Sequence, residues 1–465
     1  MSEPLSRQYM VEYEIKDGMA IIPEGAREVA WRAFEDCTDL TSITIPGSVK
    51  EIESFAFAGC SSLTSITIPE GVKFIRPHTF HGCSSLTSVT IPSGVKEIGE
   101  YAFSGCSSLT SITIPDSVTV IDECAFACCS SLTSVTIPEG VRVIGDSAFE
   151  GCSGLTGITL PGSVTEIGVY AFFGCTALTG IIIPEGVTKI GKYAFSGCTA
   201  LTGITIPDSV TEIGLYAFSG CSSLTSITIP CGVAEIEEGA FSDCSALASI
   251  AVANGNPVYD SRGNCNAIIE TATGTLASGC MNTVIPEGVT AIGSSAFRGC
   301  TALTGIIIPE SVTRIGPSAF RGCSGLAGIS IPDGVVEIDP CVFEDCSSLA
   351  GIVLPGSVKG ICAGVFAGCR SLVSITIPES VTKIGMYAFR GCRCLTSITI
   401  PDSVTEIGAY AFRGCCSLTC ITIPDGVTEI GECAFLNCSC LTSITISKGT
   451  ENGRAAFEGC PGMKK

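Results

Sequence analysis

The chain contains 465 residues, among them 54 glycines and 30 cysteines but only two histidines and one tryptophan. Its net charge of −20 argues against nucleic acid as a partner, because binding to phosphates requires a basic stripe on the protein. Although 46% of the residues are hydrophobic, no apolar run approaches the roughly 18 residues that a membrane-spanning helix needs, and we expect no membrane insertion.

Residues 1–22 lack the pattern that fills the rest of the chain, and we expect them to form an N-terminal cap. Charged residues interrupt this segment throughout, so it has no apolar core of the kind found in secretory signal peptides. No signal peptide, lipid-attachment cysteine or C-terminal anchor is therefore predicted.

A 23-residue repeat follows. Prolines recur every 23 residues and begin ten units over residues 23–252 and seven more over residues 286–446. Fixed periods of 20 to 29 residues are typical of leucine-rich repeats and predict a solenoid with one coil per unit. A single coil is too small to bury its own apolar side chains, so we expect one elongated domain that is stabilised by stacking.

The unit "PDSVTEIGLYAFSGCSSLTSITI", residues 207–229, shows what each coil should contain when its proline is counted as position 0. Alternation in "LTSITI" predicts a short strand, with positions +19 and +21 outward and +20 and +22 buried. The proline ends the strand, and Gly or Ser at +2 predicts a turn. Position +13 is Gly, Asp or Asn in all units except one, which predicts a left-handed residue that stops one short helical turn at "YAFSGC".

Seventeen of the cysteines occupy position +14, one in each coil. Equivalent atoms of stacked coils lie about 4.8 Å apart, whereas disulfides need converging Cβ atoms roughly 3.5 to 4.5 Å apart. We therefore predict a packed ladder of free thiols, although Cys416 has the alternative of pairing with Cys394 or Cys440 in an oxidising compartment. No metal is expected, because no Cys-x-x-Cys motif occurs and both histidines lie in one coil.

The outward position +21 is mostly threonine, which gives the candidate binding residues Thr44, Thr67, Thr90, Thr113, Thr136 and Thr159. One interpretation is that β-branched threonine simply suits an exposed parallel strand. The other is a long, weakly polar face that binds a protein or a glycan.

Residues 253–285 interrupt the repeat with a unit that we interpret as an irregular coil with a hairpin insert. Cys265 and Cys280 flank a predicted hairpin that turns around Thr273 and Gly274, so a cross-strand disulfide is one alternative and two free thiols are the other.

The same insert carries the candidate contact residues Tyr259, Asp260 and Arg262. A protruding hairpin is a natural contact element. The alternative is that the insert replaces a coil and its residues satisfy their own turns.

In the second array Arg370, Arg390, Arg393 and Arg413 fall at +12 or +15 of adjacent coils. They predict a small basic patch on the convex side, either a docking site for an acidic partner or a neutral feature. The array ends in residues 447–465, where Ser447 replaces the proline and we expect a degenerate C-terminal cap.

The unit I-x-x-x-A-F-x-x-C-x-x-L-x-x-I-x-I-P resembles the BspA-like leucine-rich repeat, and the segment "NPVYDSRGNCNAIIETATGTLASGCMNTVIP" resembles an insert that recurs in that family. The resemblance implies an α/β-type repeat solenoid, a right-handed array with a parallel concave β-sheet and short helical turns on the convex side. It also implies a non-catalytic adhesion protein, secreted or on the cell surface, that binds host, matrix or cell-surface proteins.

No nucleophile, base and acid set is recognisable, so we expect no enzyme and no cofactor. A monomer is expected. Two hypotheses remain: the adhesion protein that the resemblance implies, and a cytoplasmic scaffold for protein interactions with reduced thiols.

Overall fold

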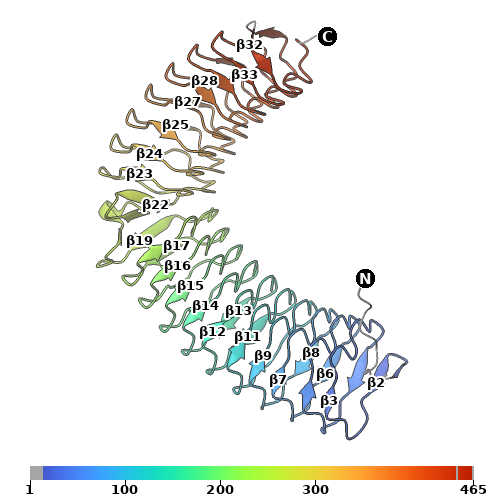
Figure 1. The fold of residues 1–465 in the computed structure, drawn as a ribbon. Coiled ribbons are helices and arrows are strands. Elements are labelled where there is room, and N and C mark those ends of the chain that lie inside the picture. Colours follow the sequence, from blue (N-terminus) through green and yellow to red (C-terminus); the bar gives the residue numbers. More distant parts are fainter. Residues whose placement is uncertain (1–13, 447–448, 463–465) are drawn as a thin grey trace. The chain divides into compact units, whose positions relative to one another are not determined.

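The structure of the chain, a computed structural model, describes residues 14–446 and 449–462. Residues 1–13 of the expected N-terminal cap, and 447–448 and 463–465 of the expected C-terminal cap, lie outside the described residues. The coils form two compact units: unit 1 comprises Met1–Leu224 and Glu235–Ala240, and unit 2 comprises Thr225–Ala234 and Phe241–Lys465. Within each unit, successive coils lie in chain order (Figure 1).

Each unit contains a row of short, separate sheets of parallel strands around coil positions +19 to +21, which we call the long ladder. In unit 1 it consists of β2 (Met19–Ile21), β4 (Ser42–Thr44), β6 (Ser65–Thr67), β8 (Ser88–Thr90), β11 (Ser134–Thr136) and β13 (Gly157–Thr159), and β1 (Ile15–Lys16) pairs antiparallel with β2. In unit 2 it consists of β17 (Ser226–Ile229), β19 (Ser249–Val252), β25 (Gly328–Ser330), β27 (Gly351–Val353), β28 (Ser374–Thr376), β30 (Ser397–Thr399), β32 (Cys420–Thr422) and β34 (Ser443–Thr445). The register is one coil per strand, so equivalent residues lie side by side, as Ser65 does with Ser88.

A second ladder of two-residue parallel strands, the short ladder, occupies positions +5 and +6, where the sequence predicted no strand. In unit 1 it consists of β3 (Glu28–Val29), β5 (Glu51–Ile52), β7 (Phe74–Ile75), β9 (Glu97–Ile98), β10 (Val120–Ile121), β12 (Val143–Ile144), β14 (Glu166–Ile167), β15 (Lys189–Ile190), β16 (Glu212–Ile213) and β18 (Glu235–Ile236). In unit 2 it consists of β23 (Ala291–Ile292), β24 (Arg314–Ile315), β26 (Glu337–Ile338), β29 (Lys383–Ile384), β31 (Glu406–Ile407), β33 (Glu429–Ile430) and β35 (Glu451–Asn452). The fold is thus a β-solenoid of stacked coils.

The predicted helical turns are not confirmed. Among the described residues only η1 (Arg262–Asn264), a 3₁₀ turn in the insert, is helical. In the regular coils some backbone N–H groups of this segment bond to the next coil and others bond within their own coil. The N–H of Phe195 donates to Ala217 O of the next coil (2.7 Å), whereas the N–H of Cys198 donates to Phe195 O of the same coil (3.1 Å). An α-helix needs every amide to bond within its own segment, so this segment is a series of tight turns that stack between coils.

The insert forms an antiparallel sheet in unit 2. Strand β20 (Tyr259–Asp260) pairs with β21 (Ala267–Glu270), and β21 pairs with β22 (Thr275–Gly279) in a hairpin, as the sequence predicted. Strand β22 then pairs in parallel with β23 of the short ladder. The insert therefore continues the stack and takes the place of a coil strand.

The core of each unit repeats with the coil. In the coil that begins at Pro184, the side chains of Val187, Ile190, Phe195 and Cys198 are 0% exposed. The phenylalanines at +11 form parallel stacks, from Phe34 to Phe218 in unit 1 and from Phe297 to Phe435 in unit 2, with centroids 5.3 Å apart between Phe195 and Phe218. Every coil buries its apolar face against the coil before and the coil after it, which is the physical basis of the array.

Candidate functional site

The threonines at position +21 lie on the outward face of the long ladder in unit 1. Thr67 lies beside Thr90, and Thr136 lies beside Thr159, in the parallel register of their strands. All six threonines of the candidate set are exposed. We call this surface the threonine face.

The hydroxyl groups of the threonine face differ from those of the neighbouring threonines at +18. The hydroxyls of Thr64 and Thr87 donate to backbone carbonyl oxygens of the preceding coil, at 3.3 and 3.0 Å. Among the described residues, the +21 hydroxyls make no such bond to the protein. The threonines at +18 therefore have a structural role, whereas those of the threonine face keep their hydrogen-bonding capacity for solvent or a ligand.

Apolar residues interrupt the +21 position further along the chain. Ile182, Ile307 and Val353 are 83%, 85% and 74% exposed. Val284, at the corresponding position of the coil before Ile307, is also 71% exposed. Exposed apolar side chains in such small numbers are ordinary features of protein surfaces.

Among the candidate residues of the insert, Asp260 and Arg262 bind each other and Tyr259 is buried. Arg262 forms a fork with Asp260, with Nε–Oδ1 and Nη2–Oδ2 distances of 2.8 and 2.6 Å, and the side-chain hydrogen bond from Arg262 lowers the pKa of Asp260. Tyr259 is only 8% exposed. A polar hollow of about 520 Å³ lies beside these residues. The hydrogen bonds of Asp260 and Arg262 are nevertheless made within their own loop, which they stabilise.

Cys265 and Cys280 are free thiols in the structure. Their sulfur atoms lie 3.8 Å from Ala267 O and 3.4 Å from Asn266 O. A disulfide between them stays a prediction that a count of free thiols would test.

The cysteines at +14 form a hydrogen-bonded ladder. Cys198 Sγ donates to Phe172 O of the preceding coil (3.2 Å), and Cys392 Sγ donates to Phe366 O in the same way (3.1 Å). Burial raises the pKa of the Cys198 thiol to about 12 and that of Cys392 well above its ordinary value. A thiol that stays protonated is a poor nucleophile and a poor metal ligand, so the ladder is structural.

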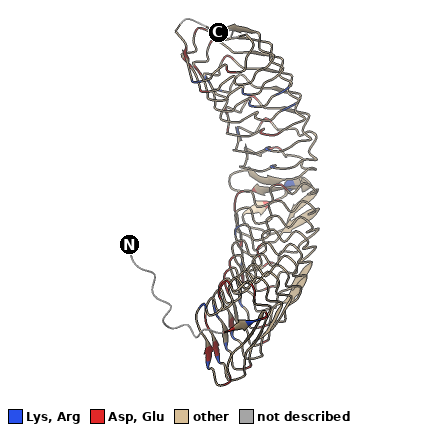
Figure 2. Cartoon of the chain, turned by 90° about the vertical axis from the view of Figure 1, so that its right-hand side faces the viewer, with Lys and Arg blue, Asp and Glu red and all other residues tan. Residues whose placement is uncertain are grey.

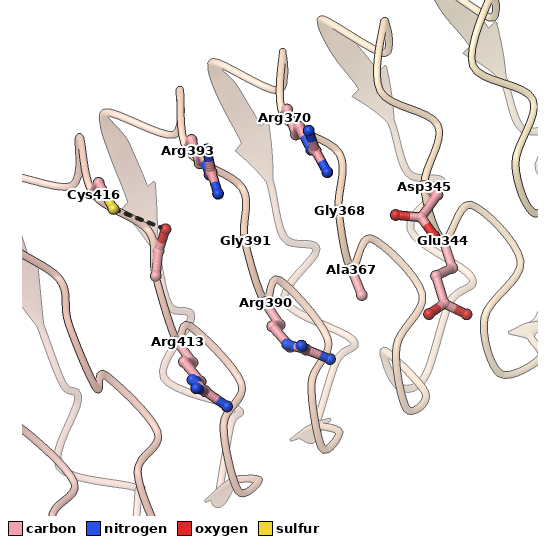
Figure 3. Close-up of a pocket in the computed structure, with 11 residues that line it drawn as sticks. Glu344, Asp345, Ala367, Gly368, Arg370, Arg390, Gly391, Arg393, Arg413 and Cys416 are labelled. Atoms are coloured by element: carbon pink, nitrogen blue, oxygen red, sulfur yellow. Dashed lines mark hydrogen bonds between the residues drawn. The ribbon is translucent and has the colours of Figure 1, made fainter.

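The four arginines at +12 and +15 meet in one groove of about 680 Å³ in unit 2 (Figure 3). Arg370 and Arg393 form one row, and Arg390 and Arg413 form a second row beside it. Asp345 and Glu344 lie at one end of the groove. We call this site the arginine groove.

A column of half-buried aromatic side chains at position +9 was not predicted, although tyrosine recurs there in the sequence. His78 stacks between Phe55 and Tyr101, with centroid distances of 4.4 and 4.8 Å, and burial lowers its pKa. Tyr170 and Tyr193 stack in the same way, at 4.9 Å. The histidine therefore packs as an aromatic ring in a stack.

Across residues 14–446 and 449–462, no group of three or more His, Cys, Asp or Glu side chains is placed to hold a metal ion. No helix within these ranges is long and apolar enough to span a membrane. Acidic residues recur from coil to coil in both units (Figure 2).

Comparison with models of known protein families matches one family over most of the chain. The family model of the BspA type leucine rich repeat region matches residues 27–156, 144–262, 277–392 and 359–465. The comparison with curated proteins gave no match.

Several solved structures are similar. A leucine-rich repeat protein from Bacteroides ovatus is 32% identical, with 82% of this chain and 86% of that chain covered and a TM-score of 0.47. A leucine rich cell surface protein from Faecalibacterium prausnitzii is 29% identical, with 94% and 93% covered and a TM-score of 0.41. A leucine-rich repeat protein from Eubacterium ventriosum, 24% identical with 87% and 90% covered, has a TM-score of 0.53 and shares the leucine-rich repeat fold.

Proposed function

Since the chain belongs to the BspA-type leucine-rich repeat family, we propose that it is a non-catalytic adhesion protein whose threonine face binds host, matrix or cell-surface proteins. Leucine-rich repeat proteins generally bind proteins, and the BspA-like family is often associated with the cell surface. The observation that carries the proposal is the row of exposed +21 hydroxyls in register, none of which the coils use among the described residues.

The threonine face suits a protein partner for physical reasons. Ser or Gly at +19 and Thr at +21 give short side chains, so a partner can approach the strands closely with little loss of side-chain entropy. The hydroxyls both donate and accept hydrogen bonds, which permits contacts to backbone groups of many partners.

A matched pair of variants tests the proposal. The full chain is immobilised, and binding is measured against a panel of matrix proteins and cell-surface ectodomains. For a partner that binds, Thr136→Lys with Thr159→Lys places two charged side chains on the threonine face, and we expect at least about a tenfold loss of affinity.

The control is Val120→Lys with Val143→Lys, which adds the same charge to the same two coils. Both valines are 43% exposed on the short ladder, and we expect less than about a twofold effect, as for residues outside an interface. Equal losses of affinity in the two variants, or no loss in either, would contradict the proposal that the threonine face is the binding surface.

The second candidate is a cytoplasmic scaffold that binds proteins with its thiols reduced. The observation that favours it is that the described cysteines are all free, several of them at the surface, which suits a reducing compartment. Brief protease treatment of intact source cells separates the two functions, because a surface protein is cleaved and a cytoplasmic one is protected.

A further inference from the structure

The arginine groove concentrates positive charge, and among the described residues the two carboxylates at its end, Glu344 and Asp345, form no ion pair with its four arginines. Arg298 and Arg321, which occupy the same position +12 in earlier coils of unit 2, pair with Asp243 and Glu344 at 3.2 and 3.0 Å. Across the part of the chain that the structure describes, Arg390 and Arg413 have no carboxylate within ion-pair distance, and the same holds for Arg370 and Arg393. Like charges on adjacent coils repel, so an anion in the groove is favoured.

Two of the arginines are held in place by aromatic rings. The guanidinium carbon of Arg390 lies 5.6 Å from the Tyr387 ring centroid, and that of Arg413 lies 5.7 Å from the Tyr410 centroid. The two rings stack with their centroids 5.1 Å apart. The two charges therefore repeat from coil to coil at roughly the spacing of the tyrosine rings. The cation–π contacts also restrict the arginine side chains before a ligand binds, so binding costs less side-chain entropy.

The N–H groups of the three glycines on the floor of the groove are already hydrogen-bonded to the protein. The N–H groups of Gly368 and Gly391 donate to Arg390 O and Arg413 O of the following coils, at 2.7 and 2.8 Å, and that of Gly414 donates to Leu436 O at 2.9 Å. These three glycines therefore offer a peptide no free N–H groups to which it could add as a strand. Recognition must come from the guanidinium groups, whose planar forks suit oxyanions in two-pronged contact.

We propose that the arginine groove binds a sulfated polysaccharide. Such a polymer carries closely spaced sulfate groups and needs no strand edge, and the groove presents it with four arginines over a floor of three glycines. An extended acidic peptide presents same-side carboxylates about 6.8 Å apart, which is longer than the 5.1 Å repeat of the tyrosines beneath the arginines. The site lies in unit 2 and is independent of the threonine face.

Heparin is the probe, and its binding to the full chain is measured by surface plasmon resonance at two salt concentrations. The variant Arg370→Gln, Arg390→Gln, Arg393→Gln, Arg413→Gln is expected to bind at least about a hundredfold more weakly, because each hydrogen bond to a charged group contributes appreciably. Conversion of the four arginines to lysine keeps the charge but removes the fork, so an intermediate loss of about tenfold is expected. Thermal melting shows whether each variant is folded.

The control uses two exposed arginines in unit 1, at position +4 of their coils: Arg27→Gln with Arg142→Gln. It is compared with the double variant Arg390→Gln, Arg413→Gln, which changes the net charge equally. We expect about a tenfold loss in the groove variant and no loss in the control.

Desulfated heparin and polyglutamate complete the test. The proposal requires that desulfated heparin does not bind and that polyglutamate binds far more weakly than heparin. Failure of the chain to bind heparin, equal losses in the groove and control variants, or equal binding of polyglutamate would overturn it, the last in favour of an acidic protein. None of these results depends on the variants of the threonine face.

Discussion

Cysteine at position +14 fits its site because the site needs a small apolar side chain that also carries a weak donor. The carbonyl oxygen of Phe172 already accepts the N–H of Cys175 (3.2 Å), and it accepts the Sγ–H of Cys198 as well (3.2 Å). Serine would be too polar for a position that is 0% exposed, and valine would fill more space in a closely packed layer.

The thiol ladder predicts an alkaline limit to stability. Burial raises the pKa of Cys83, Cys152, Cys198 and Cys346 to about 12. The unfolded thiols ionise near pH 8.5 while the folded ones stay protonated, so their stabilisation is complete below that pH and declines above it, by roughly 1.4 kcal/mol per pH unit for each thiol. We expect the free energy of unfolding, measured in urea, to be flat up to about pH 8 and to fall steeply between roughly pH 9 and 10.

Replacing Cys175 and Cys198 with alanine provides the control for this dependence. The variant loses about 1 to 2 kcal/mol per site at neutral pH through the cavities left, but its stability should fall less steeply with pH than that of the unchanged chain. A free energy of unfolding that stays constant to pH 10 in both proteins would contradict the assignment of buried, protonated thiols.

At the scale of the element, the turns between the ladders depend on two left-handed residues per coil. The residue at +13 has a positive φ in all seventeen repeat units, as the sequence predicted from its Gly, Asp and Asn content. The residue at +9 also has a positive φ in every unit, although it is often Tyr, Ser or Cys. These side chains give no signal for a left-handed conformation, so the sequence could not show that the helical turn is broken there.

A matched pair in one coil tests these two positions. Ser318, at +9, has a φ of 55° and Gly322, at +13, has a φ of 72°. Ser318→Gly should raise the free energy of unfolding by about 0.5 to 1 kcal/mol, because left-handed backbone is costly for residues with a Cβ. Gly322→Ala should lower it by about 1 kcal/mol for the same reason, and denaturant unfolding measures both changes. A loss of stability in Ser318→Gly would show that +9 is not strained.

The strands of the short ladder could not be predicted from the sequence either. Its strands contain two residues, such as Glu212 and Ile213, and alternation cannot be recognised over so short a stretch. Long-ladder strands such as β17, with the burial pattern of alternate exposed and buried residues over Ser226–Ile229, were predictable because their alternation extends further.

At the scale of the whole chain, a constant period turns each coil position into a column on the surface. This is why the sequence could place the threonines of position +21 on one face and the arginines of +12 and +15 near one another. It could not show that Arg298 and Arg321 are paired with carboxylates while Arg390 and Arg413 have none among the described residues, because pairing depends on side-chain placement between coils. It also could not show that Tyr259 is buried in the insert.

The central claim is that the cysteines at +14 pack the coils as buried, protonated thiols. Alkylation of the native protein, followed by mass spectrometry of each cysteine before and after unfolding, tests it most directly. We expect rapid labelling only of the exposed Cys128, Cys231, Cys394, Cys420 and Cys440, and labelling of the buried +14 thiols, which are all of them except Cys37, only after unfolding. A buried +14 cysteine that reacts as fast as the exposed ones, or that is found in a disulfide, would contradict the account.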